Sequence, residues 1–232
     1  MTASESYVER LSYGAFGKAR RSWVLDDTVE YGAMTAHMTY QLAHITVDDL
    51  HSLMSAFRPF GIQGNAIAEK YDEYNRQASI ISAGAIYDPG KWFVMGEGGL
   101  TELHSVLGAR SGWYTTGGYR VGQFIPYLTY GRLKGDSNTS DPGLPVAELP
   151  PFLAAPATGL NAALNGVLGS VPVQRTVAVG LRWDLHQNVD LKTQYDHTVH
   201  GAGSSGTLID LQPDFRPGGT VSLISIAMDF VL

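Results

Sequence analysis

Strict alternation of apolar and polar side chains at the C-terminal end most constrains the fold. From residue 220 the chain reads TVSLISIAMDFVL. The apolar positions are Ile224, Ile226, Met228, Phe230 and Leu232. Successive residues of a strand point to opposite faces of the sheet, so this segment is predicted to be a strand with one apolar face. The same period of two recurs in 177–185 and 189–198, which predicts an all-β chain.

The lengths of the connections between the alternating segments indicate which β architecture they form. Tight turns are expected near 34–37, 88–91, 121–123 and 186–188, whereas 49–77, 135–172 and 200–219 are long and 102–110 is shorter. Transmembrane barrels have short periplasmic turns and long outer loops. A soluble sandwich also alternates in polarity, but it has no reason to alternate in connection length. We therefore predict a transmembrane antiparallel up-and-down β-barrel whose last strand ends on the periplasmic side.

About ten strands are expected, and they form either a whole barrel or part of a larger one. The predicted spans are 25–33, 37–48, 77–88, 91–102, 111–121, 124–134, 173–185, 189–199 and 220–232, with a weaker one at 6–14. Most are close to the ~9–11 residues with which a tilted strand crosses a bilayer. We expect one domain over 1–232, in which 1–24 is least defined. Residues 1–9 are polar and do not form a signal peptide, so we expect a mature chain or a portion of a longer one.

Composition supports this class and excludes others. No run of ~20 apolar residues is present, and the mean hydropathy is −0.05, so helical membrane spans are not expected. Trp92, Trp113 and Trp183 fall near strand ends, where a barrel carries its aromatic girdles. The net charge is −6 and the only basic block is 18–21, so nucleic acid is an unexpected partner. With no cysteine, the chain has neither disulfides nor thiolate metal sites.

Four segments resemble a family of Gram-negative porins in the identity of their residues as well as in their alternation. They are YDPGKWFVMGE (87–97), GWYTTGGYRVGQFIPYLTY (112–130), LNAALNGVL (160–168) and HTVHGAGSSGTLIDLQPDFRPGGTVSL (197–223). The resemblance implies a general-diffusion channel of about sixteen strands, of which this chain is similar to the C-terminal portion. It also implies an integral outer-membrane location and contact with lipid and lipopolysaccharide, and it is compatible with a homotrimer. The end of the chain resembles the signal read by the barrel-assembly machinery, in which Phe230 matches and Leu232 replaces the usual Phe.

Charged side chains on the predicted inward face are the candidate pore lining. The bases are Arg120, Arg182 and Lys192, with Arg132 at weaker register, and the acids are Glu97, Asp184, Asp190, Asp196 and Asp229. Opposed rows of acids and bases would set a transverse field, and lining charges decide which ions pass. The alternative is that these charges pair across neighbouring strands and fill a small barrel. The connection at 142–172, helix-compatible over 157–168, is expected to pack on the barrel mouth or wall, where it would narrow the pore.

No residue pattern points to catalysis, a metal or a cofactor. GAGSSG (201–206) has the spacing of a dinucleotide-binding loop, but a strand follows it where a helix is required. His197 and His200 are an odd number of residues apart, so they point to opposite faces and cannot share a metal. We therefore expect a passive porin without a cofactor. The alternatives are a non-conducting barrel that acts through its long loops, and a soluble all-β binding protein.

Overall fold

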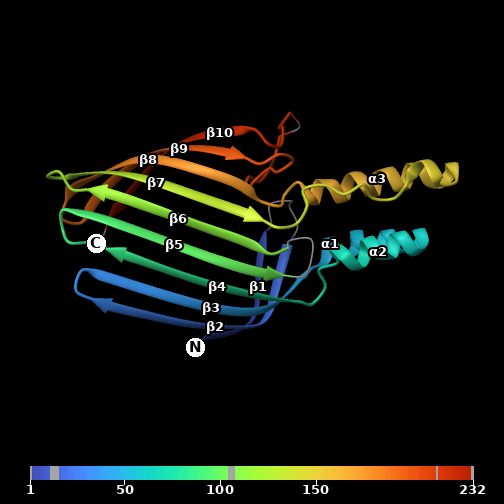
Figure 1. Cartoon of the computed structure of the whole chain (residues 1–232), viewed down its shortest axis with the longest axis horizontal. Coiled ribbons are helices and arrows are strands. Elements are labelled where there is room, and N and C mark those ends of the chain that lie inside the picture. Colours follow the sequence, from blue (N-terminus) through green and yellow to red (C-terminus); the bar gives the residue numbers. More distant parts are fainter. Residues whose placement is uncertain (1, 11–15, 104–107, 213, 231–232) are drawn as a thin grey trace.

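Ten strands in one antiparallel sheet make up most of the computed structural model, which describes residues 2–10, 16–103, 108–212 and 214–230. Each strand pairs with the next one along the chain, from β1 to β10, as the up-and-down prediction requires (Figure 1). The strands are β1 (Thr2–Arg10), β2 (Phe16–Tyr31), β3 (Met34–Val47), β4 (Arg76–Tyr87), β5 (Trp92–Leu103), β6 (Arg110–Tyr119), β7 (Phe124–Gly135), β8 (Val173–His186), β9 (Val189–His200) and β10 (Thr220–Phe230). The predicted all-β barrel class is confirmed.

Tight turns join the strands at one end of the sheet, and the long connections lie at the other end (Figure 1). The tight turns reverse the chain over very few residues, so they need backbone conformations that glycine adopts without a steric cost. Gly90 has a φ of 103° and Gly122 a φ of 60°. The N–H of Gly90 also donates to Oδ1 of Asp88 at 3.0 Å, which closes the turn between β4 and β5.

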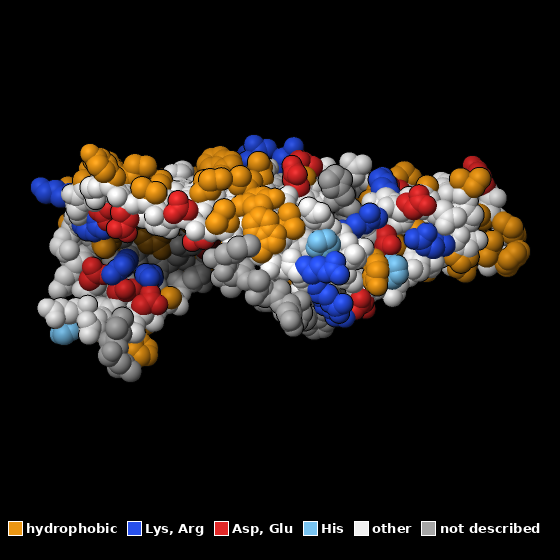
Figure 2. Space-filling view, turned by 90° about the horizontal axis from the view of Figure 1, so that it is seen from below, with side chains coloured by type: hydrophobic (Ala, Val, Ile, Leu, Met, Phe, Trp, Pro, Cys, Tyr) orange, Lys and Arg blue, Asp and Glu red, His pale blue; other side chains and the backbone are white. Residues whose placement is uncertain are grey.

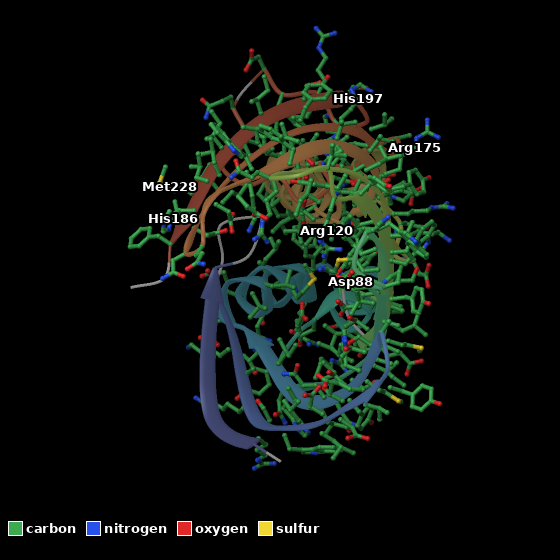
Figure 3. All side chains as sticks on the ribbon, turned by 90° about the vertical axis from the view of Figure 1, so that its left-hand side faces the viewer. Asp88, Arg120, Arg175, His186, His197 and Met228 are labelled. Atoms are coloured by element: carbon green, nitrogen blue, oxygen red, sulfur yellow. The ribbon has the colours of Figure 1, made fainter. Side chains whose placement is uncertain are left out.

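The sheet curls into a wall but does not close on itself. β1 pairs with β2 and β10 pairs with β9, and within the described residues neither has a second neighbour. Figure 3, which looks along the strands, shows the resulting curl with its opening between the two terminal strands. The described strands therefore form a partial barrel, one of the two arrangements that the strand number had suggested. An unpaired strand edge leaves backbone groups without partners, each costing several kcal/mol in hydrocarbon.

Strand bounds agree with the predicted spans within a few residues, except at the N-terminal end. The strand predicted at 25–33 is β2, which begins at Phe16, and the one predicted at 6–14 is β1, at Thr2–Arg10. A bulge between Arg20 and Trp23, where Arg21 has a φ of 51°, shifts the register of β2 against β3. A bulge inserts a residue and so reverses the alternation, which hid the first part of β2 from a period-two analysis.

The two faces of the sheet differ in chemistry. Figure 3 shows Met228, His197 and Arg175 pointing away from the curl, and Asp88 and Arg120 pointing into it. Starting from these residues, the strand registers place a broad set of exposed apolar side chains on the outer face. They include Leu25, Val29, Met38, Ile81, Leu100, Leu128, Val177, Val179, Leu181, Ile224, Ile226, Met228 and Phe230. Asp27 of β2 faces outward as well and breaks this pattern.

Pairs of aromatic rings mark both ends of the outer face. At the turn end, the ring centroids of Tyr87 and Trp92 are 5.5 Å apart, as are those of Phe124 and Trp183. At the other end, Trp113 lies 5.4 Å from Tyr130. Amphipathic rings favour the boundary between hydrocarbon and headgroups, so an apolar surface between two aromatic levels is the arrangement of a lipid-facing barrel wall.

The two longest connections fold into helices that extend from the end of the wall opposite the tight turns (Figure 1). They comprise α1 (Asp48–Phe57), η1 (Arg58–Phe60) and α2 (Gly61–Tyr71) from one connection, and η2 (Val146–Glu148) and α3 (Pro151–Leu168) from the other. We call these elements, with 136–150, the helical unit. Among the described residues, none of the helices has both the length and the apolarity that crossing a membrane demands.

The helical unit has an apolar core of its own. Fully buried side chains from α1 and α3, among them Met54, Phe57 and Leu164, pack in one cluster with residues of α2 and with Val47 at the end of β3. Polar contacts tie the two connections together, since Asp141 accepts from Tyr71 Oη at 2.6 Å and from Lys70 Nζ at 3.0 Å. The connection 142–172 therefore does not pack along the wall, which was one of its two expected placements, and a narrowing of the pore by it stays a prediction. Its apolar residues are buried against the helices of the other long connection, beyond the end of the wall.

Candidate functional site: the charged inner wall at the turn end

Two rows of charge cross the inner face of β8, β9 and β10 near the tight turns. Asp184 pairs in register with Asp190, and Asp190 with Asp229, so one row holds three acids. Two residues farther along the strands, Arg182 pairs with Lys192. Like charges directly opposite each other repel, so each row is unfavourable by itself. The acidic row and the basic row stabilise each other because they are adjacent.

Ion pairs between the two rows link all five side chains. Nε of Arg182 lies 2.6 Å from Oδ1 of Asp184, and its Nη2 lies 3.3 Å from Oδ2 of Asp190. Nζ of Lys192 lies 3.7 Å from Oδ1 of Asp190 and 2.5 Å from Oδ2 of Asp229. Four of the five, Arg182, Asp184, Asp190 and Asp229, line a hollow of about 600 Å³ at the turn end of the wall. Figure 2 shows acidic and basic side chains gathered within the hollowed part of this end.

Arg120 forms a separate clamp between two tight turns. Its guanidinium donates to both carboxylate oxygens of Asp88, at 2.8 and 2.6 Å, and to the carbonyl of Gly90 at 2.9 Å. A bidentate pair of this kind fixes geometry as well as charge. The hydrogen bonds from Arg120 hold the pKa of the Asp88 carboxyl below its usual value. The clamp therefore connects the β4–β5 turn to the β6–β7 turn on the inner side.

Replacing Arg120 with Gln should return the pKa of Asp88 toward its ordinary value. A carboxyl whose pKa is depressed in the folded state stabilises that state above its unfolded pKa, and this contribution is lost as the pH falls through the folded pKa. The effect thus lies in the acid range, below the ordinary Asp value of 3.8. NMR titration of the Asp88 carboxyl in detergent, in the native chain and in Arg120→Gln, measures it. An unchanged midpoint would show that the clamp does not form; Lys91→Gln, in the same turn, is the matched control.

The remaining predicted residues lie apart from these two clusters. Asp196 is four residues along β9 from Lys192 and accepts from Nε2 of Gln194 at 2.8 Å, and Gln194 in turn accepts from Tyr127 Oη at 2.8 Å. Glu97 of β5 is on a distant part of the wall, where Nε2 of His37 lies 3.9 Å from its Oε1. Glu97 lines a second hollow, of about 370 Å³. The predicted charges therefore occupy several places on the inner wall.

Some expectations about these residues need correction. Arg132, which was expected at weaker register to face inward, faces outward, because it is in phase with the exposed Leu128 and Tyr130 of β7. Acids and bases were expected to oppose each other across the lumen. Arg182 and Lys192 instead pair with acids on the same and neighbouring strands, as the alternative interpretation held. Of the two residues in the expected assembly signal, Phe230 is exposed on the outer face and Leu232 lies outside the described residues.

Sequence reasoning missed the acid that holds Arg120. Asp88 was identified only as a turn residue, although the turns at 88–91 and 121–123 flank a single hairpin and so meet at the same edge of the wall. Tyr127 and Gln194 were also missed as partners. Within the part of the chain that the structure describes, no three His, Asp or Glu side chains are grouped so that they could hold a metal ion. The arrangement offers an ion-paired, solvent-accessible inner wall.

Comparison with known proteins supports the fold and not a family. No family model matches the chain, and no curated protein matches it. Among solved structures, it is similar to an anion-selective porin from Comamonas acidovorans, with 10% identity and a TM-score of 0.53 over 97% of this chain. It is also similar to the outer-membrane expressed OmpT of Vibrio cholerae, with 10% identity and a TM-score of 0.51 over 97% of the chain. The matched parts cover 58% and 63% of those two chains. At this identity the likeness shows the fold alone, that of an outer-membrane β-barrel.

Proposed function

We propose that this chain forms the wall of a passive, water-filled channel in the outer membrane, through which ions and small hydrophilic solutes diffuse. The observation that carries the proposal is the division of the sheet into an apolar outer face and an inner face with charged rows at Asp184, Asp190 and Asp229 and at Arg182 and Lys192. Charges on the inner face of a closed barrel are stable when water fills the lumen. Permeation then needs no cofactor, conformational cycle or catalytic group.

The wall is proposed to belong to a larger barrel. Closing this sheet requires that the free edges of β1 and β10 pair, either with each other or with further strands. The two similar structures are longer than this chain, which supports additional strands as the partners of those edges. A lumen lined by more than ten strands is wide enough for water and hydrated ions. Phe230, outward at the end of β10, is proposed to form part of the signal that the barrel-assembly machinery reads.

Conductance in a planar bilayer tests the proposal. The chain, refolded in detergent, is first compared boiled and unboiled in SDS, because a closed barrel resists SDS in the cold and migrates differently. A preparation with this shift should then insert and give stepwise, ohmic currents in KCl. A preparation that shows the gel shift but gives no steps would disprove the channel and leave a closed, non-conducting barrel.

The helical unit supports a second candidate, a non-conducting barrel that presents this unit to an outside partner. The unit has its own buried core, and it carries large apolar side chains at exposed positions, with Ile62 93% exposed and Phe152 77% exposed. Figure 2 shows apolar side chains gathered at the far end of the projection. Such a surface is typical of a contact site. The two candidates differ in conductance, and the variants Ile62→Ala and Phe152→Ala should leave a channel unaffected.

A further inference from the structure

Two arginines lie directly opposite each other on the outer face, at the end of the wall where the long connections begin. Arg132 of β7 and Arg175 of β8 are register partners, and both are exposed. Figure 3 shows Arg175 pointing away from the curled sheet. Like charges placed directly opposite each other destabilise a sheet, by a free energy comparable in size to the gain from an opposite-charge pair. This arrangement therefore needs a compensating anion.

The surrounding outward positions do not supply that anion. On the side of β6, the register partner of Arg132 is Trp113, and on the side of β9 the partner of Arg175 is Val199. The nearest outward residues along the strands are Tyr130, Lys134, Val173 and Val177. Within the described ranges, no carboxylate forms an ion pair with either arginine, and the acid nearest in sequence, Asp136, pairs with Lys134 at 3.5 Å. The site thus has a surplus of positive charge.

The two arginines line a hollow of definite size. It measures about 320 Å³, and Tyr130, Val173 and Val199 of the outer face share its lining with them. Gln174, His200 and Gly201 complete the lining, and the two arginines are register partners and so stand at one level of the wall. The hollow therefore has space for a compact group, and two guanidinium groups are available to bind it. Guanidinium groups match phosphate oxygens in pairs, which lysine cannot do.

The level of the hollow along the wall indicates where its ligand comes from. Trp113 and Tyr130 form the aromatic pair that marks this end of the apolar band, and Arg132 is the register partner of Trp113. Toward the turn end, the outward residues Leu128, Val177 and Val179 are apolar and exposed. The arginines are therefore placed one step beyond the hydrocarbon boundary, at the depth of lipid headgroups.

We propose that Arg132 and Arg175 bind a phosphate group on the headgroup of an outer-leaflet lipid, with the acyl chains lying along the apolar band below. The proposal rests on the outer-membrane location argued above, but not on conductance, because both side chains are outside the lumen. The bound phosphate offsets the repulsion between the two guanidinium groups and fixes the β7–β8 edge of the wall at the membrane surface. The occupant is a phosphorylated lipid, for which free phosphate in solution is the competing source of the same chemistry.

Lipid titration followed by native mass spectrometry tests the site. The refolded chain in non-ionic detergent is titrated with diphosphorylated lipid A, with the same lipid after enzymatic removal of its phosphates, and with inorganic phosphate. The native chain should bind the phosphorylated lipid about tenfold more tightly than the dephosphorylated one, a preference of ~1.4 kcal/mol. Arg132→Gln/Arg175→Gln should lose this preference, and Arg132→Lys/Arg175→Lys should retain part of it, because charge remains but the paired geometry does not.

A matched variant distinguishes lipid binding in the hollow from a general attraction between positive side chains and anionic lipid. Arg20→Gln/Arg21→Gln removes two exposed positive charges from β2, which has no such opposed pair, and it should change the affinity less than twofold. An equal loss in both double variants, or binding of inorganic phosphate as tight as that of the lipid, would overturn the proposal. The cold SDS gel shift establishes that each variant is folded. Without lipid, Arg132→Gln should unfold in urea no earlier than the native chain, since it relieves repulsion.

Discussion

Replacing Asp184, Asp190 and Asp229 together with asparagine is expected to abolish the cation preference of the channel. The substitution removes the acidic row and leaves Arg182 and Lys192 facing the lumen without it. Acids outnumber bases among the inward charged residues of the described strands. The acids are Asp26, Glu30, Glu97, Asp184, Asp190, Asp196 and Asp229, and the bases are Arg76, Arg110, Arg182 and Lys192, with Arg120 and Asp88 paired at the turns.

The size of this effect follows from the distance between lining charges and a passing ion. At ~8 Å in water, one charge interacts with an ion by about 0.5 kcal/mol. Removing three acidic charges therefore shifts the free-energy difference between a cation and an anion by a few kcal/mol before screening, which is a change of tenfold or more in the permeability ratio. Screening over about 10 Å at 0.1 M salt reduces the shift, so the measurement belongs at low ionic strength.

The reversal potential in a KCl gradient gives the result directly, and it should fall toward zero in the triple variant. The matched control is Asp49→Asn/Glu69→Gln/Glu148→Gln, which removes the same charge from exposed positions of the helical unit. The control should shift the potential much less. If the triple variant keeps the sign and size of the native potential, the charged rows do not line the conducting path. Folding is not expected to suffer, because Arg182 and Lys192 are 42% and 39% exposed and water solvates them when the acids are gone.

The inner wall could be predicted from sequence wherever a strand had an uninterrupted pleat. Arg182, Asp184, Asp190, Lys192 and Asp229 fall on strands whose apolar residues alternate without a break, so their common face follows from the period of two. The ion pairs among them did not follow, because register between strands depends on the turns. β8 and β9 shift their register between Asp184 and His186, and no property of either strand alone reveals this shift.

Errors arose where glycine or a bulge hides the alternation. Arg132 stands between Gly131 and a half-buried leucine, so neither neighbour identifies its face, and only the pairing with Trp113 and Arg175 places it outside. In β2, Arg21 reverses the phase and conceals the strand before Trp23. Both cases show that alternation predicts the face of a side chain only while each residue of a strand pairs with one residue of its neighbour.

The helical unit could be predicted in part, and its packing could not. The stretch 157–168 was compatible with a helix, and α3 indeed spans Pro151–Leu168, but the connection 49–77 was expected to be loop and contains α1 and α2. A helix records in sequence which of its faces is apolar, but not which distant element covers that face. The partner of α3 is α1, about a hundred residues earlier in the chain.

Leu164→Ala is expected to unfold the helical unit locally while the wall remains intact. Leu164 is fully buried in the core that α3 shares with α1 and α2. Truncating a buried leucine costs about 2–5 kcal/mol, because the transfer free energy is lost and a cavity is left. The buried cluster of the unit comprises only eleven residues, so a loss on this scale removes much of its local stability. Amide hydrogen exchange in α1 and α3, and cleavage by a protease added from outside, should both accelerate.

The same variant decides how the helical unit relates to permeation. Its core is beyond the end of the wall, so Leu164→Ala should leave the cold SDS gel shift and the single-channel conductance as they are in the native chain. Phe152→Ala, at an exposed position of the same helix, is the control and should change the free energy of unfolding of the unit by no more than about 0.5 kcal/mol. A conductance that rises when the unit unfolds would make it a constriction after all. Unchanged hydrogen exchange in Leu164→Ala would mean that α3 does not pack on α1 and α2. If hydrogen exchange accelerates while the conductance stays the same, permeation depends on the wall alone.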